Sequence, residues 1–151
     1  MKSALTILSK FQEEGFLFHG SSEKLTFLEP RKASDTDKKR HFNSDTAVFA
    51  TPNFLFAIPF GCISNIIKNF EVPEYITWSI GFKDDRPLVQ SDFDFTPAML
   101  KVSGFVHVLP SEPFVVSDLK GRQYKAFKRV EPVAVVSASL QDFITGGCIL
   151  E

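Results

Sequence analysis

The sequence has few cysteines and no long hydrophobic run, and both shortages narrow the possible classes of protein. Its two cysteines, Cys62 and Cys148, show none of the spacings typical of zinc sites or redox dithiols. We therefore expect a reduced, cytoplasmic protein. No apolar stretch approaches the roughly 20 residues that a membrane-spanning helix requires. Charged residues interrupt the N-terminal segment, which makes it a poor signal peptide, so no membrane partner is expected.

Histidines are also scarce, and the net charge is close to zero. The net charge of −1 gives no general argument for binding nucleic acid or membranes. The three histidines, His19, His41 and His107, have no spacing typical of a metal site, so we predict no metal. His107 lies within an apolar segment and is expected to be a packed core residue. Tyrosine and tryptophan are rare beside 17 phenylalanines, most of which should therefore lie in the core.

The hydrophobic pattern predicts one α+β domain that comprises residues 1–151. A chain of this length buries roughly two-thirds of its unfolded surface. Short strands outnumber helices, which favours a split, mostly antiparallel core of two packed sheets with two or three short helices. The expected strands are 16–19, 46–51, 75–82, 104–109, 113–117, 122–128 and 132–138, and the expected helical segments are 3–14, one after Asn53 that Pro59 and Gly61 shorten or kink, 64–70, and a turn at 97–101, with 140–144 a short helix or an irregular tail.

The strongest candidate for a site follows the first predicted strand. A run of apolar residues ends at Phe18, and His19, Gly20 and Ser21 follow it. A buried strand would hold His19 at its end, and glycine allows a close approach that a side chain would prevent. Such a junction can hold a polar ligand by side chain and backbone together. A strand-to-loop junction without a ligand is the alternative.

Two basic segments could bind an anion. The long polar connection 20–45 carries Arg31 and a cluster of lysines, and it is either a lid that brings positive charge to a phosphate or a solvated loop. The second segment, 120–129, interleaves basic residues with Tyr124 and Phe127. This pattern would suit single-stranded nucleic acid, but a solvated sheet face is the default interpretation at a net charge near zero.

Several of these segments together resemble the ADP-ribosyltransferase-like fold. The resemblance is to small bacterial and phage members whose first strand carries His-Gly-Ser or His-Gly-Thr. It rests on Phe-His-Gly-Ser at 18–21, Val-Phe-Ala-Thr at 48–51, a following helix with Ala57, a mid-domain strand at 103–109, and a final strand pair containing Gln123-Tyr124 and Val-Glu-Pro-Val at 130–133.

The resemblance implies that NAD lies in a cleft between two sheets. His19 would then hydrogen-bond the adenosine ribose, and the backbone of Gly20 would hold the nicotinamide carboxamide. Ser21 would support the turn, and Phe49 would offer a ring on which nicotinamide stacks, although a shift of one residue would place Val48 there. The implied reaction transfers ADP-ribose to an unknown acceptor, a protein or a nucleic acid, and releases nicotinamide.

The sequence departs from this family at the third catalytic position. Gln123 occupies the place of a glutamate that stabilises positive charge on the ribose, and losing such a partner typically costs about 10²–10³ in rate. Among other carboxylates, Glu112 is the best substitute by its spacing, and Arg31 and Tyr124 are further candidates to contact NAD. The alternatives are an inactive relative that binds NAD, ADP-ribose or a nucleic-acid end, and an interaction domain without a ligand pocket.

Overall fold

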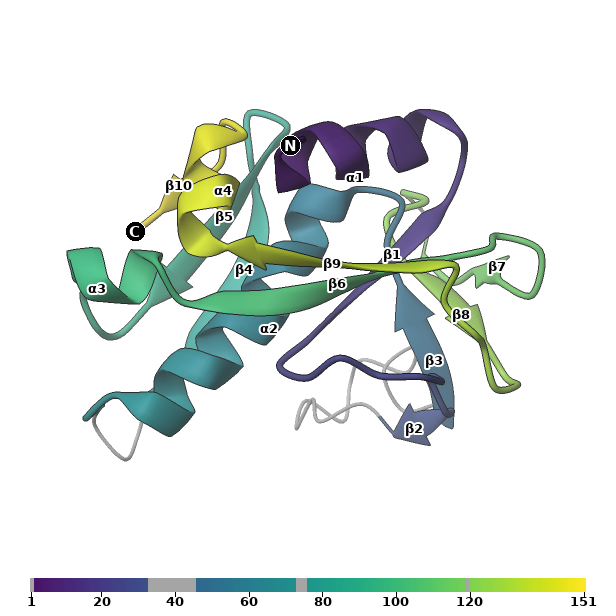
Figure 1. Cartoon of the computed structure of the whole chain (residues 1–151), viewed down its shortest axis with the longest axis horizontal. Helices are drawn as coiled ribbons and strands as arrows, with labels where there is room; N and C mark the ends of the chain where they lie inside the picture. Colours follow the sequence, from purple (N-terminus) through teal and green to yellow (C-terminus); the bar gives the residue numbers. More distant parts are fainter. Residues whose placement is uncertain (1, 33–45, 73–75, 119) are drawn as a thin grey trace.

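The computed structural model describes residues 2–32, 46–72, 76–118 and 120–151. These residues form an α+β fold of three small sheets and four helices (Figure 1). The greater part of the basic connection, 33–45, lies outside the described residues, and His41 lies outside them with it.

The first sheet contains the strand that carries His19. It is antiparallel throughout and has the order β1 (Leu17–Ser21), β6 (Ser103–Leu109), β9 (Ala134–Ser139). Two helices pack on it: α1 (Ala4–Glu13) and the long central helix α2 (Phe54–Asn69). Phe18 of β1 is completely buried in the core that these helices share with the sheet.

Another sheet adjoins the first and has the order β2 (Arg31–Lys32), β3 (Thr46–Ala50), β8 (Tyr124–Ala126), β7 (Val115–Val116). A smaller core joins the two sheets, since Leu17 of β1 packs there with Val48 and Ala50 of β3. Phe18 and Thr51 exchange backbone hydrogen bonds of 2.8 and 2.9 Å. The strands that bear His19 and Phe49 therefore lie side by side.

A further sheet lies near the C-terminus and was not expected. Its order is β10 (Ile149–Leu150), β5 (Arg86–Ser91), β4 (Trp78–Lys83), and β10 runs parallel to β5. The predicted two-sheet core is therefore wrong in number, while the prediction of mostly antiparallel pairing is confirmed. A strand of two residues cannot be distinguished from an irregular tail by its sequence, because it is too short to show alternation.

Two short helices, α3 (Pro97–Leu100) and α4 (Leu140–Thr145), lie in the C-terminal half of the chain. The expected shortening of the helix after Asn53 is wrong, because α2 continues past Pro59 and Gly61 to Asn69 and includes most of the predicted segment 64–70. Asn53 caps it as predicted, since its side chain accepts a 3.0 Å hydrogen bond from the Leu55 amide. Pro59 and Gly61 both lie among the buried residues of α2, and packing of this apolar helix outweighs the lost backbone bond.

Three glycines let α2 lie directly against β1 and β6. A Cβ atom on Gly20 would lie 1.9 Å from the carbonyl oxygen of Ala57, and one on Gly61 would lie 2.1 Å from that of Ser21. A Cβ atom on Gly104 would lie 2.5 Å from the backbone of Gly61. The close approach inferred for Gly20 from its sequence therefore exists, and the central helix makes it.

Candidate functional site

The imidazole of His19 separates β1 from β3. In an antiparallel ladder, the next pair to exchange hydrogen bonds after Phe18 and Thr51 would be Gly20 and Phe49. Instead, His19 Nδ1 donates to the carbonyl oxygen of Phe49 at 2.7 Å. The side chain thus takes the acceptor that Gly20 would have used, and the ladder between the two strands ends there.

This separation leaves the backbone of Gly20 with an open edge. Successive residues of a strand direct their N–H and C=O groups to alternate sides, so those of Gly20 point to the same side as those of Phe18. Phe18 uses its groups on Thr51, whereas in the described part of the chain nothing pairs with those of Gly20 on this side. An amide donor and a carbonyl acceptor therefore lie next to each other and can bind a ligand.

The hydrogen bond to Phe49 fixes the tautomer that a neutral His19 adopts. Because Nδ1 donates its hydrogen to a carbonyl, the lone pair is on Nε2. Burial lowers the pKa of His19, and the positive charge of Arg31 lowers this pKa further, although the hydrogen bond to Phe49 opposes both effects. Arg31 belongs to β2, which pairs with β3, the strand that carries Phe49.

An aromatic residue that sequence reasoning missed, Phe60, begins beside Gly20. The Cβ atom of Phe60 would lie 3.2 Å from a Cβ on Gly20, and the side chain is 42% exposed. Its ring centroid is 5.3 Å from that of Trp78 and 6.1 Å from that of Phe56. The i, i+4 spacing of Phe56 and Phe60 was a visible signal for a shared helix face. Only the packing of α2 on β1 places that face next to Gly20.

Phe49 contributes its carbonyl to His19, while its ring lies beside Lys125. Val48 and Ala50 point into the smaller core, so Phe49 points to the opposite face of β3. There the Nζ atom of Lys125 is 5.7 Å from the ring centroid. Arg31 pairs with Ala47 two residues away, so both cations share this face.

Gln123 and Glu112 are not brought next to His19. Strand β3 lies between β1 and β8, which Gln123 immediately precedes. The carbonyl of Gln123 accepts a 2.9 Å bond from the Ser117 amide, and its side-chain oxygen accepts a 3.4 Å bond from the Ser117 hydroxyl. Glu112 is exposed beyond the end of β6 that pairs with Leu17, on the side away from Gly20.

Two further predicted residues, Ser21 and Tyr124, have structural partners. The hydroxyl of Ser21 accepts a 3.3 Å bond from the Glu23 amide, which shapes the turn after β1. Tyr124 is half-buried opposite Ala50 and packs against the smaller core. Both residues therefore support the strands around His19.

Neither cysteine has the properties of a nucleophile. Burial is the main cause that raises the pKa of Cys62 to about 12 and that of Cys148 to about 11, so both thiols stay protonated at neutral pH. In the ranges that the structure describes, no three His, Cys, Asp or Glu residues are placed to hold a metal ion, and no helix is long and apolar enough to cross a membrane.

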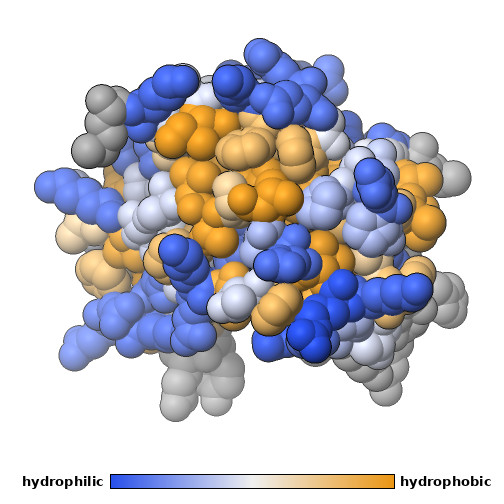
Figure 2. Space-filling view, turned by 45° about the vertical axis from the view of Figure 1, so that its right-hand side comes forward, coloured by the Kyte–Doolittle hydropathy of each residue, from blue (hydrophilic) through white to orange (hydrophobic). Residues whose placement is uncertain are grey.

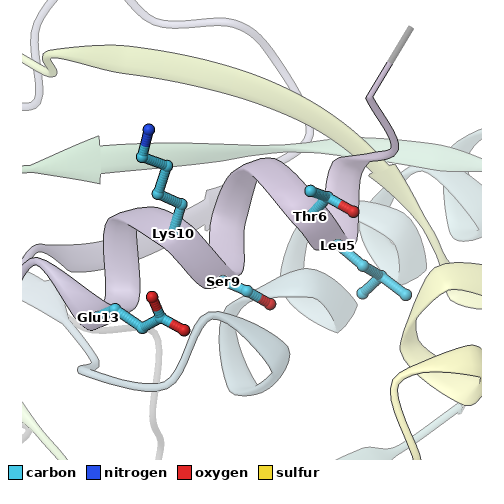
Figure 3. A pocket seen from close by; sticks show the side chains of 5 residues that line it. All are labelled: Leu5, Thr6, Ser9, Lys10 and Glu13. Carbon is cyan, nitrogen blue, oxygen red and sulfur yellow. The ribbon is translucent and has the colours of Figure 1, made fainter.

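A shallow hollow of about 540 Å³ lies on α1, outside the predicted site (Figure 3). One helix supplies all its lining residues, which are Leu5, Thr6, Ser9, Lys10 and Glu13. Side chains from a single exposed helix face do not converge on a ligand from several directions, so this hollow is a poor candidate for a small-molecule site.

Comparison with known proteins gives no indication of the function, so the function is inferred from the site alone. No family model matches the sequence, no curated protein matches it, and no solved structure matches the fold.

Proposed function

We propose that this chain is an ADP-ribosyltransferase-like protein that binds NAD or ADP-ribose where β1 separates from β3. The observation that carries the proposal is the open edge of Gly20 next to His19, whose side chain bonds the Phe49 carbonyl. Three hydrogen-bonding groups are held there by a ladder on one side and by α2 on the other. They are rigidly placed before any ligand arrives, which lowers the entropic cost of binding.

The chemistry of NAD matches these groups one by one. A carboxamide has one acceptor and two donor hydrogens, so it can pair with the N–H and C=O of Gly20 at once. A ribose hydroxyl can donate to Nε2 of His19. Phe60 offers an exposed ring for nicotinamide to stack on, and Arg31 brings positive charge toward the diphosphate. In this arrangement Phe60 replaces Phe49 as the stacking ring.

Binding without transfer is the form of this function that the geometry supports best. In the transfer reaction, an acceptor bonds to the anomeric carbon of the ribose while the bond to nicotinamide breaks, and a carboxylate stabilises the positive charge in between. Gln123 carries no charge, and its side-chain oxygen is engaged by Ser117. Transfer of ADP-ribose to an unknown protein or nucleic-acid acceptor is the second candidate function. Gln123 immediately precedes β8, so its backbone position is fixed by the sheet of β2, β3, β8 and β7.

The decisive experiment compares ligand-induced stabilisation of the wild type and His19→Asn. The asparagine amide can replace Nδ1 as donor to the Phe49 carbonyl, but it has no counterpart of Nε2. Saturating NAD or ADP-ribose, at about 100 times Kd, should stabilise the wild type by about 2.7 kcal/mol and raise its melting temperature by several degrees. His19→Asn should melt normally without ligand and show a much smaller rise. An equal rise in both proteins, or none in the wild type, would contradict the proposal.

A second measurement separates binding from transfer. Incubation of the wild type with NAD should release no nicotinamide above the rate without protein, while binding is intact. Release by the wild type that His19→Asn abolishes would show that the site cleaves NAD, by transfer to an acceptor or to water. Gln123→Glu tests whether a carboxylate at this position enables the protein to release nicotinamide.

A further inference from the structure

A second histidine, His107, connects β6 to the segment that follows β1. His107 is completely buried, and its ring lies 6.2 Å from that of His19. Its Nδ1 donates to the carbonyl oxygen of His19 at 3.2 Å, so the lone pair is on Nε2. That lone pair accepts a 2.9 Å hydrogen bond from the backbone amide of Leu25. Both ring nitrogens are thus engaged, and only one neutral tautomer satisfies both partners.

This bond holds the middle of a segment that is fastened independently at its two ends. At the start, Asn65 donates to the Ser22 carbonyl at 3.1 Å. At the end, Leu28 and Val130 exchange hydrogen bonds of 2.8 and 2.9 Å. Leu25 lies between these anchors, in the connection that leads from β1 to β2 (Figure 1). The side chain of Leu25 also packs against the smaller core, so loss of the bond to His107 would release the backbone at Leu25 while the ends of the segment stay in place.

We propose that His107 is an acid-operated latch, which at low pH releases the segment between Ser22 and Leu28 from the first sheet. A proton on Nε2 removes the lone pair that the Leu25 amide requires, so two donors would face each other. His19 can accept a proton on Nε2 while keeping its bond to Phe49, whereas His107 cannot become charged without losing a partner. The latch needs no ligand and is independent of the proposed function.

The charges around His107 determine when it opens. His19 faces it from β1, Arg31 acts on His19 from β2, and the exposed Glu23 and Lys24 flank Leu25 in the segment itself. From β9, the residue opposite is Val135, which carries no charge. Burial is the main cause that lowers the pKa of His107, and its hydrogen bond to His19 opposes this. The latch is therefore closed at neutral pH and opens on acidification.

Amide hydrogen exchange, measured residue by residue between pH 7.5 and 5, tests the latch. The protection factor of Leu25 should fall by up to roughly tenfold for each pH unit below about 6.5, because the open form binds a proton more readily. The amide of Leu28 is the internal control, and its protection should not change. His107→Gln keeps a side-chain oxygen near the position of Nε2 but does not titrate, so its Leu25 amide should show no such dependence.

NMR titration of the wild type gives a second, variant-free measurement. The Leu25 amide and the His107 ring should change with the same midpoint. The proposal is overturned if Leu25 protection is constant with pH, if Leu25 and Leu28 lose protection together, or if Leu25 and His107 titrate with different midpoints.

Discussion

At the scale of single residues, tight contact with the backbone makes three glycines necessary. Gly20, Gly61 and Gly104 lie where a helix meets a sheet, and a methyl group on any of them would overlap backbone atoms. Gly81 in β4 has nothing within 4 Å of its Cβ position. The same residue type is therefore indispensable at one place and replaceable at another, and only the neighbouring elements distinguish the two.

Gly61→Ala should destabilise the protein, and Gly81→Ala is its matched control. The new methyl group at Gly61 would lie 2.1 Å from the Ser21 carbonyl oxygen, so α2 must move away from β1. Overpacking of this kind costs roughly 1–3 kcal/mol, which should appear as a lower midpoint in urea unfolding. Gly81→Ala should leave the midpoint unchanged or raise it. Equal effects of the two substitutions would show that α2 does not make this contact.

At the scale of elements, turn chemistry determines the hairpin of β4 and β5. Asp84 and Asp85 connect the two strands, and both residues have positive φ, +52° and +61°. Two successive residues with positive φ are typical of the type I′ turn, whose twist matches that of the flanking strands. Aspartate tolerates this conformation, but glycine adopts it without steric cost.

Asp85→Gly should therefore stabilise the protein by a few tenths to about 1 kcal/mol, because relief of strain at positive φ exceeds the added flexibility of the unfolded chain. Asp94→Gly makes the same chemical change at a residue without positive φ, so it should give no such gain. Thermal and urea unfolding of both variants measures the difference. A gain of the same size in Asp94→Gly would attribute the effect to loss of the charge.

At the scale of the whole molecule, a neutral pair of histidines lies where two sheets meet. The His19 side chain on β1 donates a hydrogen bond to the Phe49 carbonyl of β3. The His107 side chain on β6 accepts one from the Leu25 amide in the connection after β1. The pKa values of both are lowered, mainly by burial. Figure 2 shows hydrophobic side chains exposed on one face of the molecule.

Acid should destabilise the fold through these two histidines. A histidine whose folded pKa is lowered binds protons preferentially when unfolded, so its contribution is complete above about pH 6.5 and is lost as the pH falls below that value. Each should add up to about 1.4 kcal/mol per pH unit to the slope until its folded pKa is reached. Urea unfolding between pH 7.5 and 5 measures this slope. His107→Gln should reduce it, and an unchanged slope would show that His107 does not titrate on unfolding.

The fold class and most strands could be predicted from the sequence because these depend on local pattern. Apolar or alternating segments bounded by turn residues predicted β3, β4 and β6. Ser3 and Asn53 cap helices that begin close to the predicted positions. The predicted strand ended at His19, and Gly20 and Ser21 were expected in the polar connection after it. They belong to β1 itself, because pairing with β6 extends the strand through Ser21.

The sequence by itself determined that His19 belongs to a strand that begins with buried residues, that the fold is α+β, and that Asn53 starts a helix, because neighbours along the chain decide these features. Only the tertiary structure decided that the His19 side chain separates two strands, that Phe60 lies beside Gly20, and that His107 holds Leu25. Each of these contacts joins residues from different elements. Such contacts depend on how helices and sheets pack, which no local pattern of residues specifies.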